Sequence, residues 1–550
     1  MSIRGQFKSF AFIGVLSSVI TASVRAAAVE PGVKHVRFLH VSDMHAQLDT
    51  HWEYLPEDPD HLRRMGGFAR IKTALDELRA SAPGAVFTLD GGDTFQGTAL
   101  AAWTKGEAVV APLNALGIDA GVPGNWEVVY GPAAFRRLLH EVNYKVICYN
   151  FANTADGKRV FAPSATLEKG GVKVAFVGVT DPTTTTRQPP AEVKGLDSTH
   201  IEGLREFIQA LKAKEKPDLV VLVDHTGLAP SVQLAHDIPE LDVVLSGHTH
   251  ERVYKPIMVG HAIVVEPGSM GSFIGQLDLT IKNGKITDHQ YELIYVDAAK
   301  YPEDPGVKKL VLKAEKPFRK RLDRVIGFTK TPLLRYDVLE GTMDNLVADA
   351  VREKAHANMG FTNGFRFSPP IPPGPITQAD LWSILPMDAR MKVGKVTGKQ
   401  LRSYLENEME LVFARDPFAL SGGWGPRPSG VDVIFHAHAP KGERIKSVKI
   451  DGKDVLDEKI YTMAGCDREG EELDIICRLK GVQDTRYVPG TIHQALEEYV
   501  RRHSPLDYPR QGRVRADDLP DHVWSQYGML QKMWNLPGSY EGVEVPGKTK

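Results

Sequence analysis

Residues 241–250 read LDVVLSGHTH, and this stretch decides how the chain is interpreted. A run of branched apolar residues predicts a buried strand, and the run stops at a polar segment that ends in His248 and His250. Strands of this kind under helices form α/β domains, in which ligands bind at the carboxyl ends of the strands. The same design recurs at residues 35–43, 85–93, 172–181 and 218–227, with helical spacing between them, as in GFARIKTALDELRA (67–80).

Metal-binding side chains follow five of the predicted strands. Oxygen and imidazole donors without thiolate suit a pair of divalent cations that share one carboxylate. Manganese, iron or zinc fits such a set better than calcium, which prefers oxygen alone. Each short motif is common by chance, but the ordered set is not. We therefore predict a two-metal site formed by Asp43, His45, Asp93, Asn125, His225, His248 and His250.

Length and composition exclude several classes of protein. The chain has 550 residues, which is too long for one hydrophobic core, so at least two domains are expected. A hydrophobic content of 42% and a charged content of 25% are typical of globular proteins. The net charge of −2 argues against a nucleic-acid or anionic-membrane partner, because such proteins usually carry a basic excess.

The first 28 residues have the pattern of a secretory signal peptide. Arg4 and Lys8 precede an apolar stretch from Phe10 to about Val24, and small residues end the segment at Ala28. An uncleaved membrane anchor is the alternative, but the apolar stretch is short for a membrane span. Adjacent arginines are absent, which favours general secretion over the twin-arginine route. After cleavage we expect no membrane span.

The chain has three cysteines, Cys148, Cys466 and Cys477. Their small and odd number argues against a disulfide framework. A bond between Cys466 and Cys477 is left open by their spacing. The chain has no CxxC motif, which disfavours a thiolate zinc site.

The chain changes character after the last metal motif. Residues 29–300 carry all the strand-end donors, and residues 301–335 are charged and predict a linker helix interrupted near Pro317. Residues 336–535 predict a second, mixed domain with two amphipathic helices. Residues 536–550 predict a loose tail.

The motifs D-x-H, G-G-D, G-N-x-E, an isolated His and G-H-x-H, in this order, resemble the calcineurin-type metallophosphoesterase superfamily. With the later N-G-x-R motif (363–366) they resemble its 5′-nucleotidase branch. The resemblance implies an N-terminal β-sandwich flanked by helices, joined by a linker helix to an α+β C-terminal substrate domain. It implies one metal held by Asp43, His45, Asp93 and His250, and a second held by Asp93, Asn125, His225 and His248. Asp93 would bridge them, and a water or hydroxide between the metals would be the nucleophile.

Longer stretches are similar to the SoxB-type thiosulfohydrolases of bacterial sulfur oxidation. They include GNWEVVYG (124–131), TNGFRFSPPIPPGPIT (362–377), GGWGPRPSG (422–430) and AGCDREGEELD (464–474), and the similarity spans about residues 35–535. It implies two manganese ions and release of sulfate, in the periplasm, from the S-sulfonated (thiosulfonate) cysteine of a carrier protein. That SoxYZ-type partner bears its cysteine on a C-terminal arm, and the hydrolase itself is expected to be a monomer. Two departures are the missing twin-arginine signal and Asn125, where this family often has His.

Trp126 stands where a phosphatase of this superfamily carries a proton-donating histidine. A persulfide leaving group is far less basic than an alkoxide and can depart without a proton. We therefore predict that Trp126 forms an apolar wall of the catalytic site, with ordinary packing as the alternative. Glu127 is expected to support the metal loop.

The second domain supplies four candidate substrate residues. Arg366 matches the anion-binding arginine of the family, and its guanidinium suits sulfonate oxygens. Asn363 is expected to orient the same group. Trp424 and Arg427 either line the mouth of the site for a carrier arm or form a rigid turn.

Two competing functions remain open from the sequence. A periplasmic 5′-nucleotidase would place aromatic residues such as Phe365, Phe367 and Trp424 around a base, but it would be expected to keep the histidine at position 126. A metal-bearing carrier or scaffold subunit that has lost its activity would not need to keep all seven donors.

Overall fold

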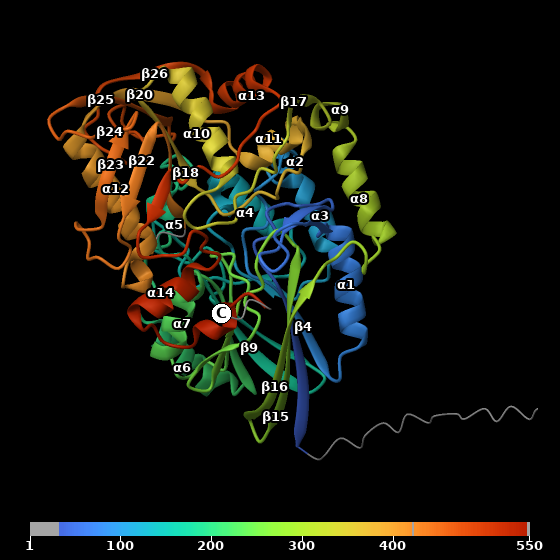
Figure 1. Cartoon of the computed structure of the whole chain (residues 1–550). Helices are drawn as coiled ribbons and strands as arrows, with labels where there is room; N and C mark the ends of the chain where they lie inside the picture. The colour runs from blue at the N-terminus through green and yellow to red at the C-terminus, as the bar shows by residue number, and fades with distance from the viewer. Residues whose placement is uncertain (1–31, 421–422, 547–550) are drawn as a thin grey trace, which may run out of the picture.

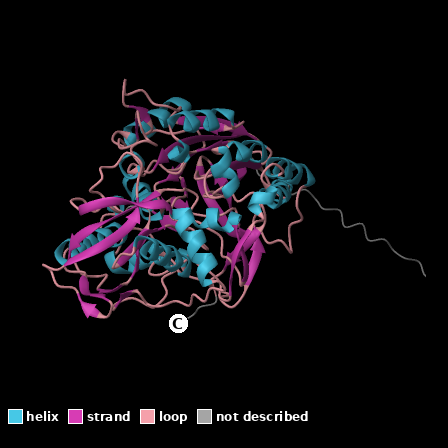
Figure 2. Cartoon of the chain, turned by 90° about the horizontal axis from the view of Figure 1, so that it is seen from above, coloured by secondary structure: helices cyan, strands magenta, loops and turns pink. Residues whose placement is uncertain are grey.

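The computed structural model describes residues 32–420 and 423–546, and it shows the two α/β domains that the motifs predict (Figure 1). Helices and strands occur together in every part of the molecule when it is viewed from above (Figure 2). The predicted signal peptide, residues 1–28, lies outside the described residues. Among the described residues, none of the helices combines the length and apolar character that a membrane crossing requires.

The first domain is a sandwich of two six-stranded sheets. Phe38 and Phe87 of the first sheet pack against Phe176 of the second, with ring centroids 6.1 and 5.4 Å away. The first sheet has the order β16 (Lys285–Tyr295), β15 (Phe273–Lys282), β1 (Val33–Val41), β4 (Ala85–Asp90), β5 (Ala120–Gly121), β6 (Lys145–Val146). The second has the order β13 (Ile257–Val259), β14 (Ala262–Val265), β12 (Val243–Ser246), β11 (Leu219–His225), β9 (Val172–Thr180), β8 (Ser164–Lys169).

Parallel pairing inside each sheet brings the motifs together. Strands β1, β4, β5 and β6 run parallel, and so do β9, β11, β12 and β14. Their carboxyl ends therefore meet at one end of the sandwich, where polar segments follow. The helices of this domain include α1 (Phe68–Ala80), α2 (Ala99–Thr104), α3 (Glu107–Asn114), α4 (Pro132–Glu141), α5 (Thr184–Arg187), α6 (Leu204–Glu215) and α7 (Leu228–Asp237).

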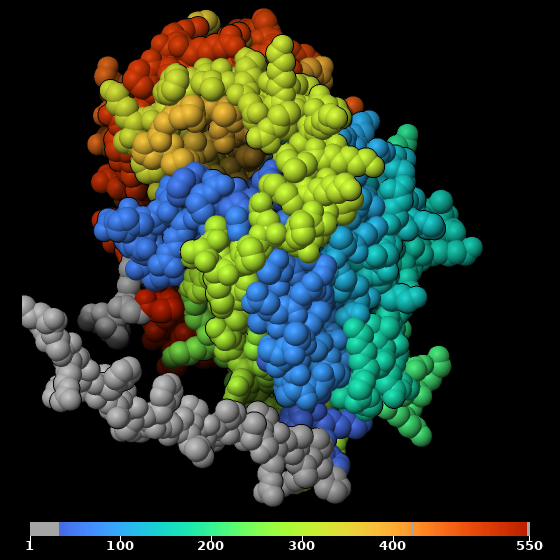
Figure 3. All heavy atoms as spheres, turned by 90° about the vertical axis from the view of Figure 1, so that its right-hand side faces the viewer, coloured from blue at the N-terminus to red at the C-terminus, as the bar shows by residue number. Residues whose placement is uncertain are grey.

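Two short helices connect the domains. Helix α8 (Pro305–Glu315) begins at Asp304, whose side chain accepts a hydrogen bond from the Val307 amide, and α9 (Arg319–Leu322) follows after a break that contains Pro317. A proline cannot continue the helical hydrogen bonding, which explains the break. The linker, coloured yellow-green, runs over the surface of the first domain toward the second (Figure 3).

The second domain is built on a five-stranded and a four-stranded sheet, with β17 (Val325–Thr329) and β19 (Gly374–Thr377) paired beside them. The first of these sheets has the order β21 (Trp424–Ser429), β18 (Met359–Gly364), β25 (Ile460–Cys466), β20 (Arg390–Thr397), β26 (Gln483–Thr491). The second has the order β24 (Lys453–Asp454), β23 (Ile445–Ile450), β22 (Val431–Phe435), β27 (Val514–Ala516). The helices include α10 (Thr342–Ala355), α11 (Gln378–Ile384), α12 (Gly398–Phe413) and α13 (Ile492–His503).

The end of the chain returns to the first domain. In helix α14 (Gln526–Trp534) the Tyr527 amide donates a hydrogen bond to Glu251, at 2.8 Å. In the 3-10 helix Tyr540–Val543 the carbonyl of Gly542 accepts one from the Tyr254 amide, at 2.6 Å. Val543 is buried in the same apolar cluster as strand β13. Residues 536–546, predicted as part of a loose tail, are therefore packed, because buried apolar contacts offset the cost of ordering them. The predicted domain boundaries remain predictions.

Candidate metal centre and cleft

Five of the seven predicted metal ligands have left-handed backbone conformations. The φ angles are 51° for Asp43, 45° for His45, 54° for Asp93, 80° for His248 and 59° for His250. Residues other than glycine rarely adopt this region, and strained backbone concentrates at functional sites. Backbone hydrogen bonds compensate, since the amides of Asp43 and His45 donate to the carbonyls of Gly92 and Asp93 at 2.8 and 2.9 Å.

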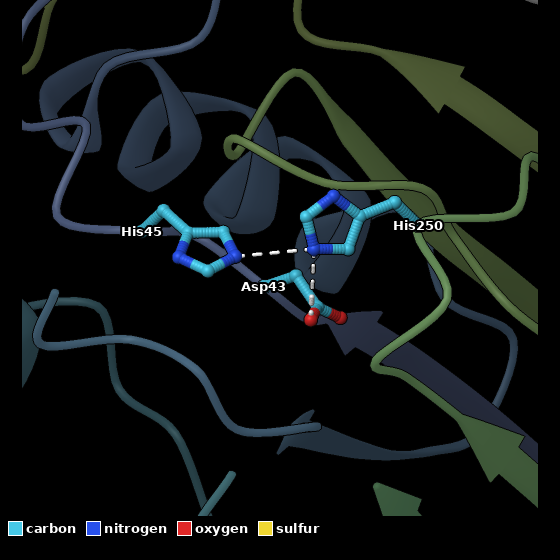
Figure 4. Close-up of side chains that lie close together, drawn as sticks. All are labelled: Asp43, His45 and His250. Carbon is cyan, nitrogen blue, oxygen red and sulfur yellow. Dashed lines mark hydrogen bonds and ion pairs between the residues drawn. The ribbon is translucent and has the colours of Figure 1, made fainter. Parts of the chain in front are cut away.

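Asp43, His45 and His250 form the first cluster (Figure 4). The Nε2 atoms of the two histidines lie 3.1 Å apart, and Nε2 of His250 lies 3.3 Å from Oδ1 of Asp43. Nδ1 of His45 lies 3.0 Å from the side-chain oxygen of Gln96, and Nδ1 of His250 lies 3.2 Å from the carbonyl of Arg366. Each Nδ1 therefore donates to an oxygen, which leaves both Nε2 atoms as acceptors facing each other. A cation between them would satisfy both.

The second cluster contains Asp93, Asn125, His225 and His248. Nε2 of His225 lies 3.3 Å from Oδ2 of Asp93 and 3.3 Å from Oδ1 of Asn125. The His248 ring lies 5.0 Å from the His225 ring. Oδ2 of Asp93 also lies 4.0 Å from Nε2 of His45, which places this carboxylate between the two clusters.

Burial and nearby carboxylates shift the pKa values of the histidines in the two clusters in opposite directions. Burial lowers the pKa of His45 to about 4, so this ring is neutral and available as a ligand. Burial also disfavours the charged form of His225, but Asp93 and Asp43 outweigh it and raise the pKa to about 10. The carboxylates thus attract positive charge strongly, and the oxygen and imidazole donors fit two divalent cations.

Residues around the clusters hold the loops that carry them. Glu127 accepts hydrogen bonds from the amides of Asp93 and Thr94, at 3.2 and 2.7 Å, which is the supporting role expected of it. Burial raises its pKa well above the usual value. The amide of Trp126 donates to Oδ1 of Asp93 at 2.8 Å.

A cleft of about 860 Å³ opens over the metal ligands between the two domains. Its floor includes Asp93, Asn125, His248 and His250 from the first domain. Three of the four predicted substrate residues also line it, namely Asn363, Arg366 and Trp424.

Aromatic side chains from both domains form one wall of this cleft. The Trp126 ring lies 5.8 Å from Phe365 and 5.4 Å from Phe367, in edge-to-face arrangements. Phe367 in turn lies 5.1 Å from the ring of His45. Trp126 is therefore both a packing residue and an apolar wall beside the metal ligands.

The Arg366 guanidinium is buried at the cleft without a carboxylate partner within ion-pair distance among the described residues. Its side chain makes one long contact, 3.4 Å, with Gln526. Burial and the positive charge of Arg187 lower its pKa to about 10. A buried guanidinium without a carboxylate in direct contact is well suited to bind an anion.

Arg187 is a second cleft arginine, which the sequence analysis missed. Its side chain lies 3.1 Å from Asp181, while its Nη1 atom is buried without a hydrogen-bond partner. Asp181 directly follows strand β9, so the strand-end rule that found the metal ligands also points to this segment. The run of threonines at 183–186 gave no sign that an arginine beyond it returns to the cleft.

Arg427 does not line the cleft, which excludes the first of the two alternatives for it, a residue at the mouth. Its side chain is 1% exposed and lies in the second domain, where it donates to the carbonyls of Asp337 and Val338 at 2.8 and 3.1 Å. Its Nε atom lies 3.3 Å from Asp344, which also pairs with Arg335 at 2.9 Å. All six residues of β21 are buried, so the Arg427 side chain lies among buried backbone groups. Its role is therefore structural.

Comparisons with known proteins agree with this architecture. The family model for calcineurin-like phosphoesterases matches residues 36–252, and the model for the 5′-nucleotidase C-terminal domain matches residues 325–467. A 5′-nucleotidase of Vibrio cholerae is 25% identical over 90% of this chain and 97% of its own length.

Two solved structures from Thermus thermophilus share the fold. One, described as the sulfate thiohydrolase SoxB, has a TM-score of 0.81 and 24% identity, covering 89% of this chain and 98% of its own. The other, a 5′-nucleotidase precursor, has a TM-score of 0.77 and 23% identity, covering 88% and 100%. At these identities the likeness shows the fold.

The position of Arg427 predicts the effect of its replacement. Arg427→Met should lower the free energy of unfolding by about 3 kcal/mol, because it leaves buried carbonyls and a carboxylate underpaired. Urea unfolding checks this, with Arg415→Met, at an exposed arginine, as the control. A raised KM with unchanged stability would instead restore the role at the mouth.

Proposed function

We propose that this chain, which belongs to the 5′-nucleotidase family of calcineurin-like metallophosphoesterases, releases sulfate from the thiosulfonate (S-sulfosulfanyl) cysteine of a sulfur-carrier protein. Its membership makes it a metal-dependent hydrolase of that family. The observation that carries the sulfur-specific proposal is Trp126, which occupies the position between Asn125 and Glu127 and packs against Phe365 and Phe367. An indole N–H is too weak an acid to protonate a leaving group at this point of the cleft.

The reaction that this wall permits is hydrolysis with a weakly basic leaving group. A water oxygen attacks the sulfonate sulfur of the S-sulfosulfanyl cysteine (Cys–S–S–SO3⁻), and the bond between that sulfur and the neighbouring sulfane sulfur breaks. The electron pair leaves with the sulfane sulfur as the cysteine persulfide anion, and the two protons of the attacking water pass to solvent as sulfate forms. An alkoxide would need protonation, which general acids accelerate about 10²–10⁴-fold. Two divalent cations held by the seven donors, manganese by our proposal, would supply water activation at near-neutral pH.

Side chains of both domains would hold the sulfonate. Arg366 presents a buried guanidinium group to the cleft and Arg187 a partly buried one, from opposite domains, and Asn363 lines the same cleft. Guanidinium groups bind paired oxygens in two parallel hydrogen bonds. Trp126 and Trp424 would exclude water from the sulfur–sulfur bond.

The size of the cleft is compatible with a protein-borne substrate. A volume of about 860 Å³ has room for a modified cysteine together with neighbouring residues of a peptide arm. We propose that the cysteine-bearing arm of a SoxYZ-type carrier enters it, in the periplasm. The Thermus thermophilus protein described as a sulfate thiohydrolase shares the fold over nearly its whole length and supports this proposal.

A 5′-nucleotidase activity is the second candidate, favoured by the names of the sequence relatives. A nucleobase inserted between two aromatic rings needs a separation of about 7 Å, twice a stacking contact. Phe365 and Phe367 stack directly on each other with centroids 4.9 Å apart, so they leave no slot for a base. This arrangement disfavours a nucleobase between these two rings, while the sulfur substrate needs no such slot.

The first test compares the two substrates on manganese-loaded protein. We expect sulfate release from a peptide with a thiosulfonated (S-sulfosulfanyl) cysteine to exceed phosphate release from a nucleoside monophosphate by at least about 100-fold, the lower limit of the missing acid's effect. Asp93→Asn should abolish it, because this carboxylate lies between the clusters. Dominant phosphate release would establish a nucleotidase and overturn the proposal.

Trp126→His should raise phosphate release, since it restores an acid beside the leaving group, and leave sulfate release unimproved. Trp126→Phe is the matched control, which keeps an apolar ring and should change neither ratio strongly. The ratio of the two kcat/KM values checks this. An unchanged ratio in the histidine variant would show that position 126 does not select the substrate.

Arg187→Gln should raise the KM for the sulfonated peptide about tenfold or more, because a charge-assisted hydrogen bond contributes about 1.5–3 kcal/mol. Arg187→Lys should recover part of the loss, and Arg137→Gln, at an exposed arginine, should have no effect. Steady-state kinetics and competitive inhibition by inorganic sulfate measure it. A variant with wild-type KM and sulfate inhibition would assign Arg187 only to its pair with Asp181.

A further inference from the structure

A second set of metal-binding side chains lies in the second domain, outside the cleft. Strands β22 and β27 run parallel, with Phe435 beside Ala516, so their carboxyl ends meet. His436 and His438 follow the first strand, and Asp517 and Asp518 follow the second. This is the same principle that gathers the ligands of the catalytic site, acting on a smaller sheet.

The donors of this set converge on one point. One donor atom from each of His436, His438 and Asp518 lies within 4.8 Å of the other two. Nε2 of His436 is 3.4 Å from Oδ2 of Asp518, and Nδ1 of His438 contacts the same oxygen. Two imidazoles and a carboxylate are a common ligand set for zinc and related transition ions.

Surrounding hydrogen bonds hold the donors in place. The amides of Ala437 and His438 both donate to the Asp518 carboxylate at 2.9 Å. Nδ1 of His436 lies 2.9 Å from Asp517, which fixes the ring so that Nε2 faces the other donors. A carboxylate behind a histidine in this way is typical of metal sites, where it orients the ring and strengthens it as a ligand.

The simplest alternative to a metal site is a pair of His–Asp hydrogen bonds that hold two loops together. His61 and Asp58 show what such a contact looks like, with Nδ1 2.9 Å from the carboxylate on the surface. That pair belongs to none of the three-donor groups among the described residues, whereas His438 shares its carboxylate with a second histidine. The shared oxygen and the oriented second ring distinguish the two cases.

We propose that His436, His438 and Asp518 bind one zinc-class divalent ion, in addition to the two ions of the catalytic centre. The remaining coordination positions would hold water, because the two histidines are partly exposed. The ion would tie the ends of β22 and β27 together next to α14, since Trp534 of that helix lies beside the His438 ring, with centroids 6.2 Å apart. Its role is structural and independent of the hydrolytic function.

The test is zinc stoichiometry of the full chain after equilibrium dialysis. We expect His438→Ala and Asp518→Asn each to bind one zinc ion fewer than the wild-type protein. His61→Ala, the matched control, should bind the same number as the wild type. Cobalt binding should give a visible absorption band. Its intensity should be lower in both variants than in the wild type and unchanged in the control.

Circular dichroism verifies folding of each variant, and sulfate or phosphate release should be unchanged, because neither residue lines the cleft. His438→Gln serves if the alanine variant does not fold. Equal zinc stoichiometry in the wild type and the folded variants would overturn the proposal, and so would a cobalt spectrum that none of the substitutions changes.

Discussion

The burial of acidic and imidazole groups at one end of the sandwich is the constraint on which the rest of the structure depends. Asp43 and Asp93 are almost completely buried, together with His45, His225 and His248. Buried charges are costly unless they are paired or coordinate a metal. Both Asp carboxylates lie within 4.0 Å of His225, and the Nε2 atoms of His45 and His250 lie only 3.1 Å apart. The fold tolerates this arrangement as a preformed cation site, built on backbone that is itself strained.

The second domain completes this site as well as covering it. The carbonyl of Arg366 orients the ring of His250, and Phe367 packs on the ring of His45. Both contacts come from the loop after β18, so two ligands of the first cluster depend on how the domains meet. The return of α14, through Tyr527 and Glu251, ties the same region from the other side. A change in domain docking is therefore expected to alter metal affinity in addition to substrate access.

The regularities of parallel sheets made much of this architecture predictable. Apolar strands that stop at polar residues located all seven donors, and the structure brings them into two adjoining clusters. Arg427 could not be assigned in this way, because a sequence does not reveal whether an arginine in a strand points to a cleft or to buried carbonyls. Arg187 was missed because it lies in the short helix α5, several residues beyond the end of β9, and the sequence does not show that this helix returns its side chain to the cleft. The packing of residues 536–546 depends on contacts with Tyr254 and Ile257, which are far away in sequence.

The wall at Trp126 links the choice of reaction to the packing of the two domains. Its indole packs against Phe365 and Phe367 of the second domain, while its own amide donates to Asp93. Edge-to-face aromatic pairs contribute about 0.5–1.5 kcal/mol each beyond the area they bury. A smaller, protonated ring at this position would lose those contacts and would have to be solvated or paired. A histidine in the loop is therefore expected to raise phosphate release only in part, and a fully efficient phosphatase with this fold would also need polar groups where the two phenylalanines stand.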